Sequence, residues 1–468
     1  MTPTMKPSRM LIMSVLLLTS AAGLHLNAQE TAAIKVKPSS EIGIVKPVNG
    51  VGQAPLLGFS TQMFHYLGEA GIPYCRTHDV GGAFGKNVFF DIPNLFRDFD
   101  ADETDPASYD FTFTDIYVKA LEENGVEPFF RLGVTIENYA EIKSYRVYPP
   151  KDFDKWARIC EHVIRHYNEG WADGFHFNIR NWEIWNEPDN HQDIVQNDMW
   201  KGTWEQYMEL YKVAAGHLKS CFPELNIGGY GSCGFYAVTG KHVPGANSSP
   251  RHEYFMDCFH SFLDFVRDNS LPLDFFSMHS YAAPDQALTQ IGYCRSYLDS
   301  CGFKDTKISF NEWLPQPSKK KLGTAEQAAM IGAELIGLQN GPVDNAEIYD
   351  ARCSAPSDYS PLFNAMTLEP FKAYYDYMMF NELRKLGTQV ELEGVPETLY
   401  ATAATNEDKS VCAIMMANIG KEPVPFKIKA KGYTVQEVLV IDDTRTYEPA
   451  ALPASIASAT VLLVKLSK

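Results

Sequence analysis

The stretch NWEIWNEPDN, residues 181–190, places two tryptophans and an isoleucine directly before Asn186 and Glu187, and Pro188 follows. An apolar run that ends on polar side chains is typical of a buried parallel strand, whose carboxyl end carries the functional groups. Strict alternation puts Asn186 and Glu187 on opposite faces, so both reach one pocket only if the regular strand ends there. Pro188 favours this, because it removes a backbone donor and holds Glu187 extended.

Similar apolar runs, separated by longer amphipathic stretches, occur along most of the chain. They are residues 44–51, 73–79, 127–133, 225–231, 273–281, 307–313 and 345–351. Helices are expected between them, such as 114–124, closed by Gly125, and 325–340, capped by Thr324 and Gln327. Eight βα units close into a (β/α)8 barrel, so the predicted fold class is α/β, with the barrel over residues 29–390.

The pattern changes after residue 390 to short alternating strands with closely spaced turns. Such spacing predicts a small antiparallel β-sandwich domain over residues 391–468. Residues 30–46 are also strand-like and are a candidate addition to this second domain.

Composition limits the partners. The formal charge of −17 disfavours nucleic acid and anionic membrane surfaces, whereas an aromatic content of 13% supplies rings that stack on sugars. A neutral substrate therefore fits better than an anionic one. The nine cysteines lack the spacing of a zinc site or a disulfide framework, and no metal or cofactor is expected.

The first 28 residues have the pattern of a signal peptide. Lys6 and Arg9 precede an apolar run that is too short for a comfortable membrane span, and Ala28 offers a small residue at the cleavage edge. The mature chain is expected to begin near Gln29, without membrane insertion, in the periplasm or outside the cell.

Two glutamates stand at the predicted carboxyl ends of strands, Glu187 after the fourth and Glu312 after the seventh. Two such carboxylates across a barrel mouth can flank one glycosidic bond. Alternation in KISFNEW, residues 307–313, puts Ile308, Phe310 and Glu312 on one face. The positions of the two glutamates therefore predict glycosidase chemistry.

The same segments resemble a known family. WEIWNEPD and FNEW are similar to the acid/base and nucleophile blocks of clan A glycoside hydrolases, most closely family 39, which holds β-xylosidases and α-L-iduronidases. The resemblance also covers RTHD, GVEPFFRLG, SMHSY and the trailing β domain. It implies a retaining, two-glutamate enzyme with a carbohydrate substrate, in which Glu187 is the acid/base, Glu312 the nucleophile and Asn186 a donor to the sugar 2-hydroxyl. As the acid, Glu187 is expected to be protonated at neutral pH, because the charge of Glu312 raises its pKa.

Other residues are assigned to substrate binding. The resemblance matches His78, His279 and Tyr281 to subsite positions, with Tyr281 favoured as hydrogen-bond partner of the nucleophile. Trp313 adjoins Glu312, and Asp350 closes the last barrel strand. The substrate-binding set is His78, Asn186, His279, Tyr281, Trp313 and Asp350.

The sequence departs from the family pattern at Trp182, Arg131 and residues 347–352, EIYDAR, and these departures concern the choice of sugar. Arg131 or Arg352 could grip a substrate carboxylate, which keeps an α-L-iduronidase-like uronic-acid glycosidase open. Neutralisation by Asp350 and a neutral, β-xylosidase-like substrate are favoured. A catalytically silent carbohydrate-binding barrel is the other alternative, but binding alone needs neither glutamate.

One motif is set aside. GYGSCG, residues 229–234, fits a dinucleotide-binding pattern, but Gly240, Pro244 and Gly245 interrupt the helix that such a site requires.

Overall fold

The computed structural model describes residues 31–58, 60–80, 89–135, 147–240, 249–353 and 357–468. The signal peptide predicted for residues 1–28 lies outside these ranges and stays a prediction. Within the described ranges, no helix is long and apolar enough to span a membrane.

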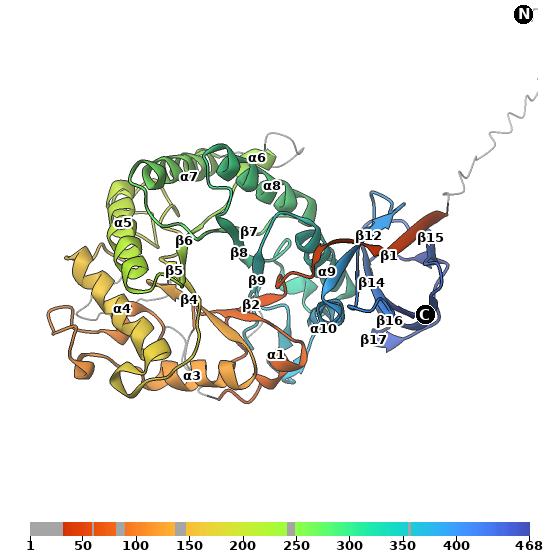
Figure 1. Ribbon diagram of the computed structural model, residues 1–468, viewed down its shortest axis with the longest axis horizontal. Coiled ribbons are helices and arrows are strands. Elements are labelled where there is room, and N and C mark those ends of the chain that lie inside the picture. The colour runs from red at the N-terminus through yellow and green to blue at the C-terminus, as the bar shows by residue number, and fades with distance from the viewer. Residues whose placement is uncertain (1–30, 59, 81–88, 136–146, 241–248, 354–356) are drawn as a thin grey trace, which may run out of the picture. The chain divides into compact units, whose positions relative to one another are not determined.

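Eight parallel strands close into a barrel, with the helices around it (Figure 1). The barrel strands are β2 (Gly50–Gly52), β3 (Tyr74–Arg76), β4 (Glu127–Leu132), β5 (Asn181–Ile184), β6 (Asn226–Ser232), β7 (Phe275–Ser280), β8 (Lys307–Trp313) and β9 (Asn345–Tyr349). The predicted (β/α)8 barrel is therefore confirmed. The first strand is much shorter than predicted, because Ile44 ends a different strand, β1 (Ala32–Ile44), outside the barrel.

Ten helices are described, and several of them begin or end at capping residues. They are α1 (His65–Glu69), α2 (Ile92–Leu95), α3 (Thr112–Glu123), α4 (Phe153–Glu169), α5 (Trp204–Cys221), α6 (Tyr236–Gly240), α7 (Pro250–Asp268), α8 (Pro284–Ser300), α9 (Ala325–Asn340) and α10 (Lys372–Leu386). Thr203 and Gln206 form a capping box at the start of α5, and Thr324 accepts from the Gln327 amide at the start of α9. Gly170 ends α4 at φ 76°, a conformation that glycine adopts without strain.

A helix does follow GYGSCG, contrary to the sequence prediction, but α6 is only five residues long. Isolated helices of this length are marginal, and α6 is held by packing against α7 and α8.

The predicted β-sandwich takes the form of one curled, nine-stranded sheet. Its members are β1, β12 (Thr388–Glu393), β13 (Tyr400–Thr405), β14 (Val411–Asn418), β15 (Val424–Lys429), β16 (Thr434–Ile441), β17 (Thr446–Pro449), β18 (Ser455–Ile456) and β19 (Thr460–Ser467). The pairs are antiparallel except for β1 with β15. A short hairpin, β10 (Phe363–Asn364) and β11 (Glu369–Pro370), precedes α10.

Alternation along β14 shows how this sheet joins the barrel. Cys412, Ile414 and Met416 are buried in a core that the sheet itself encloses. Ala413 and Met415, on the opposite face, belong to the main core, where β14 contacts α9 and α10. Both faces of the strand are therefore buried, and the sheet is a packed part of the molecule.

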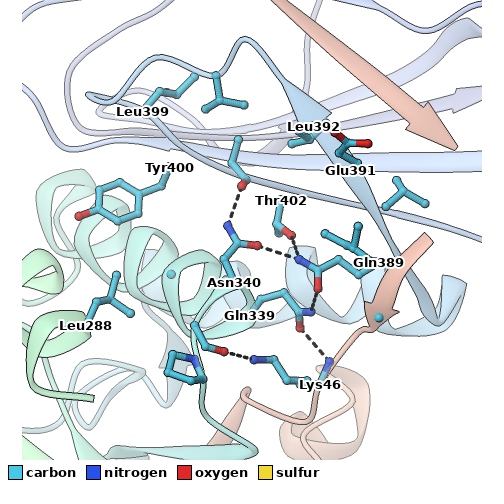
Figure 2. A pocket seen from close by; sticks show the side chains of 18 of the residues that line it. Lys46, Leu288, Gln339, Asn340, Gln389, Glu391, Leu392, Leu399, Tyr400 and Thr402 are labelled. Atoms are coloured by element: carbon cyan, nitrogen blue, oxygen red, sulfur yellow. Dashed lines mark hydrogen bonds between the residues drawn. The ribbon is translucent and has the colours of Figure 1, made fainter. Parts of the chain in front are cut away.

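A cavity of about 910 Å³ lies at the junction between the barrel helices and the sheet (Figure 2). Side-chain amides cross the junction: Gln339 Nε2 donates to Gln389 Oε1 at 2.7 Å, and Gln389 Nε2 donates to Asn340 Oδ1 at 2.8 Å. The cavity lies where α9 ends and before β9 begins, at the amino end of the barrel strands. The two glutamates lie at the opposite, carboxyl ends, so this cavity is not the candidate active site.

Candidate active site

The end of β5 brings Asn186 and Glu187 to the same site. The regular strand ends at Ile184, and Trp185 and Glu187 take positive φ angles of 73° and 46°. Asn186 Oδ1 accepts from Arg76 at 2.6 Å, and Glu187 Oε1 lies 2.8 Å from His279 Nδ1. The regular strand therefore ends before Asn186 and Glu187, as the sequence required for both side chains to reach one pocket. The extended conformation predicted for Glu187 is wrong, because its φ is left-handed.

A β-bulge in β8 aims Glu312 at the same site. Phe276 packs on Phe259 of α7, and its register partner Ile308 faces outward with it, as does Phe310 two residues later. Alternation alone would turn Glu312 outward as well. The register shifts after Ser277–Ser309, so that Glu312 pairs with His279, and the predicted shared face of Ile308, Phe310 and Glu312 is wrong.

His279 lies between the two glutamates. Its Nδ1 is 2.8 Å from Glu187 Oε1 and 3.8 Å from Glu312 Oε2. One oxygen of each carboxylate and a ring nitrogen of His279 all lie within 4.8 Å of one another. Retaining glycosidases separate their carboxyl groups by about 5–5.5 Å, whereas inverting enzymes need about 6.5–9.5 Å.

Two donors hold Glu312 in place. Tyr281 Oη donates to Glu312 Oε1 at 2.6 Å, and Arg76 Nη1 donates to Glu312 Oε2 at 2.9 Å. Both donors stabilise a charged carboxylate, since each of its oxygens accepts one short hydrogen bond. The partnership of Tyr281 with Glu312 is the one that the sequence favoured.

Arg76 and Glu183 are central to the site, although neither is among the site residues predicted from the sequence. Arg76 Nε donates to Glu183 Oε2 at 2.8 Å while its two terminal nitrogens reach Asn186 and Glu312. Glu183 Oε1 accepts from Ser277 at 2.6 Å and from Asn311 at 2.7 Å. The available signal was the presence of an arginine and a glutamate inside otherwise apolar barrel strands, because buried charges need partners.

The guanidinium also orients the Asn186 amide. Arginine can only donate, so the side-chain oxygen of Asn186 faces Arg76 and its Nδ2 is left to donate elsewhere. This orientation is the one that a donor to a sugar hydroxyl requires.

The ionisation of Glu187 differs from the sequence expectation. Burial raises the pKa of Glu187, but the hydrogen bond from His279 and the charge of its imidazole outweigh burial, and the net pKa is lowered. Burial lowers the pKa of His279, but the charge of Glu312 and the bond to Glu187 outweigh it, and the net pKa is raised. The predicted raised pKa of Glu187 is therefore wrong for the free enzyme, because the shared proton favours the imidazole.

Two polar residues that follow Glu187 in the chain, Asp189 and Asn190, lie near it. Asn190 Nδ2 donates to Glu187 Oε2 at 3.1 Å and lies 3.8 Å from Cys233 Sγ. Asp189 is buried and accepts from Ser232 Oγ at 3.1 Å. Burial and then the charge of Glu187 raise the pKa of Asp189 to about 7.

His78 is buried beside the central network. Its Nδ1 accepts from Arg131 Nε at 3.1 Å, and its Nε2 lies 3.1 Å from Asp79 Oδ1. Burial and the charge of Arg76 hold the pKa of His78 well below its usual value. His78 is therefore neutral, and both ring nitrogens face protein groups.

The two arginines considered for a substrate carboxylate both have carboxylate partners. Arg131 Nη2 donates to Asp91 Oδ1 at 2.6 Å, and neither side chain is exposed. Arg352 pairs with Asp350 at 2.8 Å, as the sequence favoured, and Ser360 Oγ donates to Asp350 Oδ1 at 3.0 Å. Each charge is thus neutralised, although the partner of Arg131 is Asp91.

Trp313 is buried and stacks on Phe310, with ring centroids 6.3 Å apart. Phe310 faces outward from the barrel, so Trp313 packs on that side. The structure therefore places this predicted substrate-binding residue away from the paired glutamates.

Glutamates at the ends of β5 and β8 of a (β/α)8 barrel, with their oxygens this close, are an arrangement typical of a retaining glycoside hydrolase. Residues 53–300 match the family model described as "Glycosyl hydrolases family 39". The chain belongs to this family and is a retaining glycoside hydrolase.

Relatives of known sequence agree with this assignment. The chain is 22% identical over 359 residues to a β-xylosidase of Caldicellulosiruptor saccharolyticus, covering 69% of this chain and 68% of that one. It is 29% identical over 208 residues to a β-xylosidase of Geobacillus stearothermophilus, covering 42% and 36%. A human α-L-iduronidase is 27% identical over 177 residues, 38% of this chain and 24% of that protein.

Solved structures show the same fold. A glucosidase from Croceicoccus marinus superposes with a TM-score of 0.71 at 20% identity, covering 94% of this chain and 99% of that one. A monomeric β-xylosidase from Caulobacter crescentus gives 0.68 at 16% identity, covering 93% and 99%.

Proposed function

We propose that the protein is a β-xylosidase-like hydrolase in which Glu312 is the nucleophile and Glu187 the acid/base. The observation that carries this proposal is the convergence of Glu187, His279 and Glu312, with their contacting atoms within 4.8 Å. This closeness supports direct attack by one carboxylate, because retaining enzymes hold their two carboxyl groups nearer together than inverting enzymes do.

The reaction then takes two steps. Glu312 attacks the anomeric carbon and breaks the glycosidic bond, while Glu187 gives its proton to the leaving oxygen, and a glycosyl ester of Glu312 forms. Water replaces the ester oxygen at the same carbon as Glu187 takes a proton from it. The sugar leaves with its original anomeric configuration, and both carboxyl groups return to their starting states.

His279 supplies the proton for the first step. In the free enzyme the shared proton favours Nδ1 of His279, which is 2.8 Å from Glu187 Oε1. Transfer across this hydrogen bond makes Glu187 the acid when the leaving oxygen arrives. In the free enzyme the charge of Glu312 raises the pKa of His279. Formation of the ester removes this charge and its effect on His279.

The substrate that fits best is a neutral sugar. Arg131 and Arg352, the two arginines that the sequence singled out for a substrate carboxylate, each pair with an aspartate, Asp91 and Asp350. A uronic acid would have to displace one of these partners and leave it unpaired, which is costly in a buried site. The uronic-acid alternative is therefore less favoured.

A panel of aryl glycosides tests this choice. Wild type and Arg352→Ala are compared on β-xyloside, glucuronide and iduronide, and the anomeric configuration of the first-formed sugar is recorded. A β-xyloside preference with retention is expected in both proteins. A uronide preference that collapses in Arg352→Ala would overturn the neutral sugar but not the two-glutamate mechanism.

We also propose that the protein is exported. The basic and apolar pattern before Ala28 supports this, and the carbohydrate substrate of a glycoside hydrolase is commonly outside the cell. Mass spectrometry of the protein secreted by its native host should give an amino terminus near Gln29. An intact amino terminus on protein from the cytosol would refute the proposal.

A further inference from the structure

A second group of metal-ligating side chains lies on the outer helices, away from the catalytic pair. It consists of Glu161 on α4 and of His217 and Cys221, one turn apart on α5. All three are partly exposed, with 14% of the Glu161 side chain and 30% of the His217 side chain accessible. Cys221 is a free thiol.

The ligand atoms of these residues converge. His217 Nε2 is 2.6 Å from Glu161 Oε2 and 3.8 Å from Cys221 Sγ, and all three atoms lie within 4.8 Å of one another. Zinc binds histidine nitrogen and carboxylate oxygen at about 2.0–2.1 Å and thiolate sulfur at about 2.3 Å. Tetrahedral bonds of these lengths separate nitrogen from sulfur by about 3.5 Å and nitrogen from oxygen by about 3.3 Å.

The nitrogen–sulfur distance is therefore close to that of a zinc site. The nitrogen–oxygen distance is shorter, because a proton now joins Glu161 to His217, and these groups must separate by less than 1 Å to admit a metal. We propose that Glu161, His217 and Cys221 form a surface site for a divalent metal of zinc type, with the fourth position open to water.

The surroundings orient the carboxylate for this role. Arg165 Nε donates to Glu161 Oε1 at 2.8 Å, on the oxygen that does not face His217. A hydrogen bond to the second oxygen of a ligating carboxylate fixes its direction, as neighbours of metal ligands commonly do. Arg165 also contacts Glu169 and stacks on Phe222, which hold the guanidinium in this position.

The ligand set selects the kind of metal. One thiolate, one imidazole and one carboxylate suit a borderline-soft ion such as Zn²⁺, whereas Mg²⁺ and Ca²⁺ prefer oxygen ligands. Such an ion would join the middle of α4 to the last turn of α5. Because a metal that binds only the folded chain favours folding, it should also raise the melting temperature.

Cobalt titration of the full-length protein tests the site, since Co²⁺ replaces Zn²⁺ in tetrahedral sites and gives a thiolate charge-transfer absorption band. One equivalent of Co²⁺ is expected to give this band, Zn²⁺ to displace it, and Zn²⁺ to protect Cys221 from alkylation by iodoacetamide. Cys221→Ser and His217→Gln should each weaken binding at least tenfold, and Cys221→Ser should abolish the band.

Cys301→Ser is the matched control, because Cys301 is also a partly exposed free thiol near a helix end. It should retain the band. The catalytic group of Glu187, His279 and Glu312 can also attract metal, but it contributes no thiolate of its own. A band of equal intensity in Cys221→Ser, or no band at millimolar Co²⁺ in the wild type, would overturn the proposal.

Discussion

Replacement of Arg76 by methionine removes the cation that joins three barrel strands while it keeps most of the side-chain volume. The guanidinium is 1% exposed and donates to Glu183, Asn186 and Glu312. After the change, Glu183 keeps Ser277 and Asn311 on one oxygen, and Glu312 keeps the hydrogen bond from Tyr281. The other oxygen of Glu183 loses its cationic partner, and Glu312 Oε2 keeps only the more distant His279 Nδ1, at 3.8 Å.

The expected loss of stability follows from these contacts. A hydrogen bond to a charged group contributes about 1.5–3 kcal/mol, so two lost bonds to carboxylates predict about 3–6 kcal/mol. This agrees with about 3–5 kcal/mol for breaking a buried ion pair by removing one partner. The loss should be larger near pH 8 than near pH 5, since protonation of an unpaired carboxylate at low pH removes its buried charge.

Urea unfolding followed by tryptophan fluorescence at about pH 5 and about pH 8 measures this difference. Arg180→Met is the control, because Arg180 is 53% exposed and its ion pair with Glu127 should contribute about 1 kcal/mol or less. The reasoning fails if Arg76→Met and Arg180→Met lower the free energy of unfolding by similar amounts, or if the loss for Arg76→Met is independent of pH.

Three further predictions concern the catalytic groups. Glu312→Ala should abolish turnover of every glycoside, and added azide should restore activity with an inverted product; wild-type-like activity would remove Glu312 from the mechanism. Glu187→Ala should lose about 10²- to 10⁴-fold in the first step on a disaccharide but far less on an activated aryl glycoside, and equal losses would indicate a positioning role instead. His279→Gln removes the residue that lowers the pKa of Glu187, so burial should raise that pKa. With an aryl glycoside whose slow step is deglycosylation, the acidic limb of the pH profile of kcat should move to higher pH. An unmoved limb would contradict this role of His279.

The barrel could be predicted from the sequence because each strand carries its own local signal. The apolar runs that end at Glu187 and Glu312 also identify the paired carboxylates, because the functional groups of such a barrel lie at the carboxyl ends of its strands. The direction of Glu312 could not be predicted, because alternation assumes a regular strand and the bulge in β8 depends on its pairing with β7.

Pairs between distant residues were a second limit of prediction from the sequence. The pair of Asp350 with Arg352, two residues apart, could be expected, whereas Arg131 pairs with Asp91, which lies 40 residues earlier in a segment without any catalytic signal. The role of Arg76 could not be predicted for the same reason. Its three partners are Glu183 on β5, Asn186 just after β5, and Glu312 on β8, and they become neighbours only once the barrel has closed.

Strand β1 is synthesised long before the strand with which it pairs. It leaves the ribosome early, yet its partner β12 is made much later: the bonded pair Lys35 and Glu393 lie 358 positions apart. Ile34 and Val36 are buried in the core of the sheet in the folded protein. Until β12 is made they lack these packing partners, and the backbone edge of β1 can pair with other chains. Lys35 and Lys37 alternate with these apolar residues. Lysines on an edge strand disfavour edge-to-edge association, so they should limit aggregation of the nascent chain until the partner strands of β1 have been made.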